Sequence, residues 1–211
     1  MYNERLLRLL AETQIPKVFL DTSSLVAPDE LNGDLLLMES RTSVRRITCH
    51  LLEQGRTLPG FIGDISYAQS NRERYEGFCQ ALADAGKKVD SSLCLTTPLG
   101  IDTYREEIDT FLSSLSRMPD AFVCASDYVA CILMQLLEKR GLRVPEDVAV
   151  SGFDNNTEDL LAEHLTTVQV FNEELGARLA LQILYRIKYP NTPHEITYLG
   201  TNVLYRDSTG D

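Results

Sequence analysis

The chain has 211 residues, of which 44% are hydrophobic and 24% are charged, a balance typical of a globular protein with a sizeable core. Its formal net charge of −11 excludes binding of nucleic-acid phosphates by this chain alone, because such binding requires clustered lysine and arginine side chains. No stretch approaches the roughly 18 apolar residues of a membrane span, and the charged residues 1–14 do not resemble a secretion signal. These features predict a cytoplasmic protein that does not cross a membrane.

Apolar runs and helical apolar spacing alternate along the chain. In chain order, the patterns predict a helix around residues 6–10, a strand at 17–21, a helix at 44–55, a strand at 60–65, a helix at 75–86, a strand at 91–97, a helix at 104–115, a strand at 121–125, a helix at 127–141, a strand at 147–153 and a helix at 173–188. Gly55 and Gly86 stand where two helices should stop, and Asp127 and Asn172 are available as helix N-caps. Apolar strands separated by helices predict an α/β fold with a parallel sheet covered on both faces.

Several polar side chains fall just beyond the carboxyl ends of predicted strands. Asp21 closes the first strand, Ser126 and Asp127 follow the strand of the sequence AFVCA, and Asp154 ends the run VAVSGF. Ligands of parallel sheets bind beyond these strand ends, where loops and helix N-termini converge. These residues are therefore candidates for one binding site.

Arg74 lies in the first turns of the helix that follows the strand GFIGDI. Its planar guanidinium suits an anionic or hydroxyl-rich ligand, for which Asp21 and Asp154 would supply hydrogen-bond acceptors. Two simpler interpretations remain open from position alone. Arg74 is also compatible with a solvated surface position, and Asp154 with a cap on the turn that begins at Asn155.

The motifs of common catalytic sites are absent from the sequence: there is no GxSxG elbow, no phosphate-binding loop and no GxGxxG after a strand. The three histidines are dispersed, and the five cysteines form no C-x-x-C pair, so we expect free core thiols, no metal and no cofactor. The cysteines are Cys49, Cys79, Cys94, Cys124 and Cys131. A binding module is expected rather than an enzyme, although an α/β enzyme remains an alternative.

The order of motifs along the chain is informative. Residues 119–155 read PDAFVCASDYVACILMQLLEKRGLRVPEDVAVSGFDN; HLLEQGR and FIGD precede them, and LTTVQV, EELGARLALQIL and YRDST follow them. These motifs span nearly the whole chain, and together they resemble the LacI/GalR family of bacterial transcription regulators. In that family a strand leads to an Asn-Asp or Ser-Asp pair, a helix and the pattern G-x-x-V-P-x-D-V-x-V-x-G-F-D.

The resemblance implies an effector domain with a periplasmic-binding-protein-like fold, made of two α/β lobes joined by three crossing strands. The crossings are expected near Met38, at residues 167–171 and at residues 190–193. By this scheme the N-terminal lobe comprises residues 1–38 and 169–190, and the C-terminal lobe comprises residues 39–168 and 193–211. In the family a helix-turn-helix and the first part of the N-terminal lobe precede the segment LLRLLAETQIPKVFLD. An incomplete N-terminal lobe and no helix-turn-helix are therefore expected in this chain.

The resemblance also implies a function. A small effector, expected to be a sugar or a related metabolite, binds between the lobes, and the change in their orientation controls operator binding by an N-terminal helix-turn-helix in a repressor dimer. The residues expected to bind the effector are Asp21, Arg74, Ser126, Asp127 and Asp154. The residues expected at the homodimer interface are Tyr128, Ile132 and Leu161, with a core position for Ile132 left open.

A solute-binding protein of a transporter is the alternative, because it shares this fold. The absence of a secretion signal, the expected free thiols and the closing motif YRDST favour the regulator.

Overall fold

The computed structural model describes residues 3–100, 102–156 and 163–210. Its helices are α1 (Glu4–Ala11), α2 (Arg41–Glu53), α3 (Gln69–Asp84), α4 (Tyr104–Ser114), α5 (Asp127–Lys139) and α6 (Asn172–Lys188). Its strands are β1 (Val18–Leu20), β2 (Asp34–Met38), β3 (Pro59–Ile62), β4 (Cys94–Leu95), β5 (Ala121–Cys124), β6 (Ala149–Ser151), β7 (Thr167–Gln169), β8 (Ile196–Leu199) and β9 (Asn202–Leu204). Within these described residues, no helix has the length and apolar character needed to span a bilayer.

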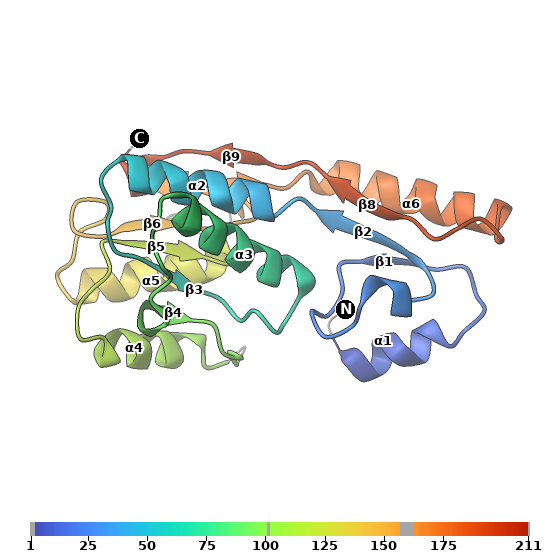
Figure 1. The fold of residues 1–211 in the computed structure, drawn as a ribbon, viewed down its shortest axis with the longest axis horizontal. Helices are drawn as coiled ribbons and strands as arrows, with labels where there is room; N and C mark the ends of the chain where they lie inside the picture. Colours follow the sequence, from blue (N-terminus) through green and yellow to red (C-terminus); the bar gives the residue numbers. More distant parts are fainter. Residues whose placement is uncertain (1–2, 101, 157–162, 211) are drawn as a thin grey trace.

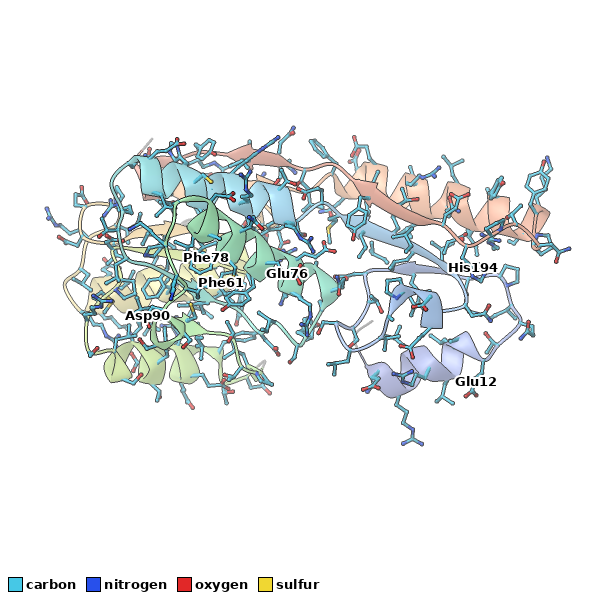
Figure 2. All side chains as sticks on the ribbon, viewed as in Figure 1. Glu12, Phe61, Glu76, Phe78, Asp90 and His194 are labelled. Atoms are coloured by element: carbon cyan, nitrogen blue, oxygen red, sulfur yellow. The ribbon has the colours of Figure 1, made fainter. Side chains whose placement is uncertain are left out.

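The larger lobe contains a four-stranded parallel sheet in the order β4-β3-β5-β6. Helices α2 and α3 cover one face, and α4 and α5 cover the other (Figure 1). Strand side chains alternate between two apolar cores: Phe61 faces α2 and α3, whereas Ile62 and Phe122 face α4 and α5. Figure 2 shows Phe61 close to Phe78 of α3, and their ring centroids are 5.6 Å apart. The predicted parallel sheet flanked by helices is confirmed.

The smaller lobe contains a three-stranded parallel sheet in the order β1-β2-β8. Helix α1 packs on one face of it, where Leu7 joins a buried cluster with Phe19, Leu35 and Leu37. Helix α6 runs alongside β8 and contacts β1 (Figure 1). The two lobes lie end to end, with the N-terminus in the smaller one (Figure 1).

A buried ion pair ties α6 to the start of β2. Arg186 is 3% exposed and Asp34 is 1% exposed, and the Nε of Arg186 donates to Oδ2 of Asp34 at 3.0 Å. The side-chain amide of Gln182 and the backbone N–H of Glu195 also donate to this carboxylate, each at 2.9 Å. Burial alone would raise the pKa of Asp34, but the bonds from Arg186 and Gln182 outweigh burial and hold the pKa below its ordinary value.

Three segments pass between the lobes: β2 leads into α2, β7 leads into α6, and β8 leads into β9. Strands β7 and β9 form an antiparallel pair beside the larger lobe. The third passage falls at residues 200–201, not at residues 190–193 as expected, so residues 193–199 lie with the smaller lobe. The reason is that β8 continues in parallel register along β2, from Leu35–Ile196 to Met38–Leu199, after Asp34 has fixed the start of the strand.

Two of the predicted helix caps differ from the observed ones. Ser126, rather than Asp127, caps α5, because its extended backbone lets Oγ accept the N–H of Val129 at 3.3 Å. Asn172 is the first residue of α6, and the cap position belongs to Phe171, which makes no side-chain capping bond. Strand β4 has only two residues. The apolar patterns predicted no strand at β2, β7, β8 or β9, although the family resemblance implied crossing strands near Met38 and at residues 167–171.

Candidate functional site

The guanidinium of Arg74 lies at the carboxyl ends of β5 and β6. Helix α3 begins at Gln69, so Arg74 is in its second turn. Its Nη1 donates to the carbonyl of Ala125, which follows β5, and its Nη2 lies 3.5 Å from Oδ1 of Asp154. Its central carbon is 3.6 Å from the centroid of the Phe153 ring, a cation–π arrangement. Since Arg74 is 4% exposed, it is a desolvated cation and not a solvated surface residue.

Asp154 is held in an unusual backbone conformation beside Arg74. Its φ of +109° is in a region that residues other than glycine rarely adopt, and such strain clusters at functional sites. The crossing strand β7 fixes this conformation, since the N–H of Asp154 donates to the carbonyl of Val168 at 3.0 Å. The side chain keeps 43% of its surface exposed, although burial of the carboxyl raises its pKa and Arg74 partly offsets that rise. A half-exposed carboxylate thus lies next to a buried guanidinium.

The polar atoms of Ser126 and Asp127 lie at the same strand ends but bond to the protein. Ser126 caps α5, as described above. Asp127 is 2% exposed; its Oδ1 accepts the hydroxyl of Thr167 at 2.6 Å, and its Oδ2 accepts the N–H of Asn156 at 2.8 Å. A β-carbon on Gly152 would come within 2.2 Å of Oδ1 of Asp127, so only glycine fits there. Asp127 therefore joins the start of α5 to β7 and to the loop after β6.

Protonation of Asp127 makes the stability of the folded protein depend on pH. Burial raises the pKa of Asp127 to about 6, with a smaller rise from Asp154, although Thr167, Asn156 and Arg206 favour its charged form. The folded pKa lies above the unfolded value of about 3.9, so the folded state keeps a proton that the unfolded state loses between these values. This contribution to stability is complete below pH ~4 and is lost as the pH rises through about 6.

We therefore expect Asp127→Asn, which cannot titrate, to gain stability relative to the natural protein as the pH rises from 4 to 7. The expected change in the difference between their free energies of unfolding is about 1 to 3 kcal/mol. Urea unfolding of both proteins at several pH values measures it. A difference that stays constant, or that changes in the opposite direction, would contradict the buried and protonatable carboxyl.

Asp21 comes from the smaller lobe and reaches α3, one turn before Arg74. Its φ is +56°, and it is 1% exposed. Its Oδ2 accepts the hydroxyl of Ser70 at 2.6 Å, and its Oδ1 accepts the N–H of Thr22 at 2.7 Å and that of Ser70 at 3.3 Å. The structure thus brings Asp21 near the predicted cluster. Its carboxylate, however, is buried and links the smaller lobe to α3.

Phe153, whose ring lies against the guanidinium of Arg74, is not among the predicted site residues. The available signal was an aromatic residue between a strand-end glycine and the carboxylate of Asp154. Ser70, the partner of Asp21, is also not among the predicted site residues. In both cases the role depends on a residue far away in the sequence.

The predicted dimer residues have three different environments. Tyr128 is 57% exposed, and its ring meets that of Tyr104 edge-on at 5.7 Å. Ile132 is 7% exposed and belongs to the core between α5 and the sheet, so the structure shows the core position that the sequence left open for it. It occupies the side of α5 that faces the strands. Leu161 lies outside the described residues.

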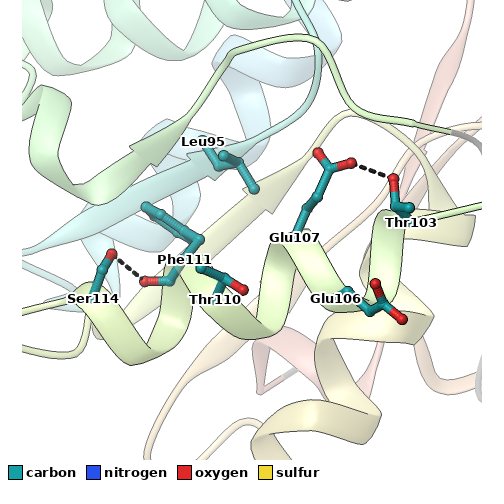
Figure 3. A pocket seen from close by; sticks show the side chains of 7 residues that line it. All are labelled: Leu95, Thr103, Glu106, Glu107, Thr110, Phe111 and Ser114. Atoms are coloured by element: carbon teal, nitrogen blue, oxygen red, sulfur yellow. Dashed lines mark hydrogen bonds between the residues drawn. The ribbon is translucent and has the colours of Figure 1, made fainter.

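A separate cavity of about 570 Å³ lies along α4 (Figure 3). Its lining residues are Leu95, Thr103, Glu106, Glu107, Thr110, Phe111 and Ser114. Glu107 accepts hydrogen bonds from the hydroxyl of Thr103 and from the N–H of Gly100, so its carboxylate holds the start of α4. None of the five predicted effector-binding residues is among these side chains. In the part of the chain that the structure describes, no group of three or more His, Cys, Asp or Glu side chains could hold a metal ion.

The fold and the strand-end residues define a two-lobed α/β binding domain. The periplasmic binding protein-like domain family matches residues 48–209, and the chain belongs to this family. The HTH-type transcriptional repressor PurR of Aliivibrio fischeri is 29% identical over 98% of this chain and 61% of that protein. The HTH-type transcriptional regulator DegA of Bacillus subtilis is 31% identical over 80% of this chain and 48% of that protein. The chain thus spans about half to three-fifths of the length of these relatives.

Solved structures agree with these relatives. The cellobiose complex of the transcriptional regulator CelR superposes with a TM-score of 0.79 at 26% identity, over 97% of this chain and 69% of that chain. A LacI-type transcription regulator from Bifidobacterium animalis subsp. lactis shares the fold, with a TM-score of 0.80 at 22% identity, over 99% of this chain and 76% of that chain. The relatives are transcription regulators and not enzymes. The chain thus has the fold of the ligand-binding domains of LacI/GalR-type regulators, in agreement with its motifs.

Proposed function

We propose that this chain is the ligand-sensing part of a LacI/GalR-type regulator and that its effector binds at the carboxyl ends of β5 and β6. The observation that carries this proposal is the pair formed by Arg74 and Asp154. A guanidinium that is 4% exposed faces a carboxylate that is 43% exposed, at the strand ends where ligands of parallel sheets bind. Together they offer donors and acceptors with fixed positions to a ligand that reaches this edge.

The chemistry of the pair favours a polyhydroxylated ligand. Each hydroxyl of a sugar both donates and accepts, so it can donate to Asp154 while it accepts from Arg74. The related regulator CelR has been solved with cellobiose, which supports a sugar as the class of effector for this chain. In this proposal Ser126 adds a hydroxyl to the site, whereas Asp127 and Asp21 position the elements around it.

The wider setting is part of the same proposal. A homodimer in the cytoplasm would place two such domains under two DNA-binding segments, as operators with two half-sites require. The exposed ring of Tyr128 on α5 is a candidate contact between the two copies. Operator DNA is then bound by a helix-turn-helix outside these residues, because a net charge of −11 does not suit a phosphate backbone.

Thermal unfolding in the presence of monosaccharides and disaccharides, with cellobiose among them, tests the ligand class. A ligand at 100 times its Kd adds about 2.7 kcal/mol of stability, which raises the Tm of a domain of this size by roughly 5 to 10 °C. The shift should already appear at submillimolar sugar and grow with the logarithm of its concentration, because general stabilisation by excluded sugars requires much higher concentrations. If no sugar raises the Tm at submillimolar concentration, the sugar class is wrong.

A further inference from the structure

A buried carboxylate lies on α3 at the boundary between the lobes. Glu73 is 3% exposed, although it precedes the candidate ligand contact Arg74 by one residue. Its Oε1 accepts the hydroxyl of Tyr198 at 2.7 Å and the side-chain amide of Gln69 at 3.2 Å. Tyr198 belongs to β8 of the smaller lobe and lies just before the third passage between the lobes. Burying a carboxylate is costly without such donors, so Tyr198 stabilises Glu73 only while the lobes keep this arrangement.

The first turn of α3 depends on the smaller lobe in the same way. Its N-cap residue Ala68 has no side chain that could cap a helix, and the first N–H groups of a helix have no partner within it. The N–H of Gln69 donates instead to the carbonyl of Thr22 at 2.8 Å, and the N–H of Ser70 donates to Asp21 at 3.3 Å. Separation of the lobes would leave these groups without their partners.

We propose that the hydrogen bond between Tyr198 and Glu73 is a clasp that holds the two lobes in this relative arrangement and positions α3. Tyr198 is 50% exposed, but burial of its hydroxyl and the bond to Glu73 raise the pKa of Tyr198, so the hydroxyl stays protonated and can donate. The bond joins strand β8 to the second turn of α3, next to the residue that reaches Asp154. Glu73 and Tyr198 are positioning residues, because neither needs to touch a ligand.

The consequence for ligand binding rests on the proposed function. If Arg74 binds the effector, loss of the clasp leaves the donor groups of Arg74 intact but makes the position of Arg74 less fixed. The clasp itself is independent of any ligand and can be tested on the protein alone.

Amide hydrogen exchange, read by NMR, tests the clasp in Tyr198→Phe, which removes one hydroxyl and keeps the ring. The amide of Gln69 is the reporter, because its bond to Thr22 crosses the lobe boundary. Loss of the hydrogen bond to this buried carboxylate should make exchange at Gln69 on the order of tenfold faster or more. Amides of β5 inside the larger lobe should keep their rates, since a general loss of stability would accelerate them as well.

Tyr189→Phe is the matched control, because Tyr189 is 43% exposed at the C-cap of α6 and its ring meets Tyr185. Exchange at Gln69 should stay within about twofold of the natural protein in this control. Glu73→Gln keeps an acceptor oxygen without the charge and should give an intermediate rate. Unchanged exchange at Gln69 in Tyr198→Phe, or equal acceleration at β5, would overturn the clasp. Either result leaves the proposed ligand site untouched, because no ligand is present in the experiment.

Discussion

Replacing Arg186 by alanine should lower the free energy of unfolding by about 3 to 5 kcal/mol, the usual cost of leaving a buried charge without its partner. Asp34 would remain 1% exposed within the sheet, with only Gln182 and Glu195 to donate to it. The substitution also removes the bonds from Arg186 to the carbonyls of Thr192 and Pro193, which hold the turn between α6 and β8. Urea unfolding monitored by circular dichroism measures the effect.

Arg143→Ala is the matched control for this prediction. Arg143 pairs with Asp147 at 3.0 Å, but its side chain is 68% exposed, and exposed pairs contribute about 0 to 1 kcal/mol. Replacing both members of the buried pair by apolar residues, as in Arg186→Met with Asp34→Leu, should cost less than Arg186→Ala, because no charge is left unpaired. Equal losses in Arg186→Ala and Arg143→Ala would show that the buried pair is not what holds α6 to the sheet.

Arg74→Ala and Asp154→Ala should each weaken effector binding at least tenfold, on the proposed function. Truncating one partner of a desolvated, charged hydrogen bond typically costs about 2 to 5 kcal/mol, and the exposure of Asp154 places it at the lower end of that range. Arg74→Ala also removes the donor to the carbonyl of Ala125 and the contact with Phe153, so it should have the larger effect. Calorimetric titration with the sugar that raises the Tm at submillimolar concentration measures both affinities.

Arg117→Ala controls for the loss of an arginine as such. Its side chain is 61% exposed and pairs with Asp90 at 3.3 Å, and neither residue is among the predicted site residues. Binding by this variant should equal that of the natural protein. Unchanged affinity in both Arg74→Ala and Asp154→Ala, in variants that remain folded, would reject this site.

The sequence determined the class of fold because its signals are local. Apolar runs such as AFVCA and the spacing of Val44, Ile47 and Leu51 predict strands and helices wherever they occur, and helices between apolar strands require a parallel sheet. Gly55 and Gly86 follow the ends of α2 and α3 with positive φ, as predicted. The placement of Arg74 near Asp154 was also foreseeable, because parallel strands end at the same edge of a sheet.

Only the tertiary structure decided what the other polar residues do. Asp127 is a residue type that often caps helices, but its two carboxylate oxygens accept hydrogen bonds from Thr167 and Asn156. The cap of α5 is Ser126 instead. Asp21 reaches α3 one helical turn before Arg74, but its carboxylate is buried at the lobe boundary, where it accepts a hydrogen bond from Ser70.

The same limit applies to positions whose pattern was compatible with two environments. Helical spacing places Ile132 on one face of α5, but only the packed sheet shows that this face is the core. Strand β8 has no periodic signal of its own, and its place beside β2 depends on Asp34, more than 150 residues earlier in the chain. Propensity and periodicity are properties of neighbouring residues, whereas burial and hydrogen-bond partners are fixed by contacts between residues that are far apart in the sequence. The sequence alone therefore determined most helices and strands, and the folded chain determined which residues they contact.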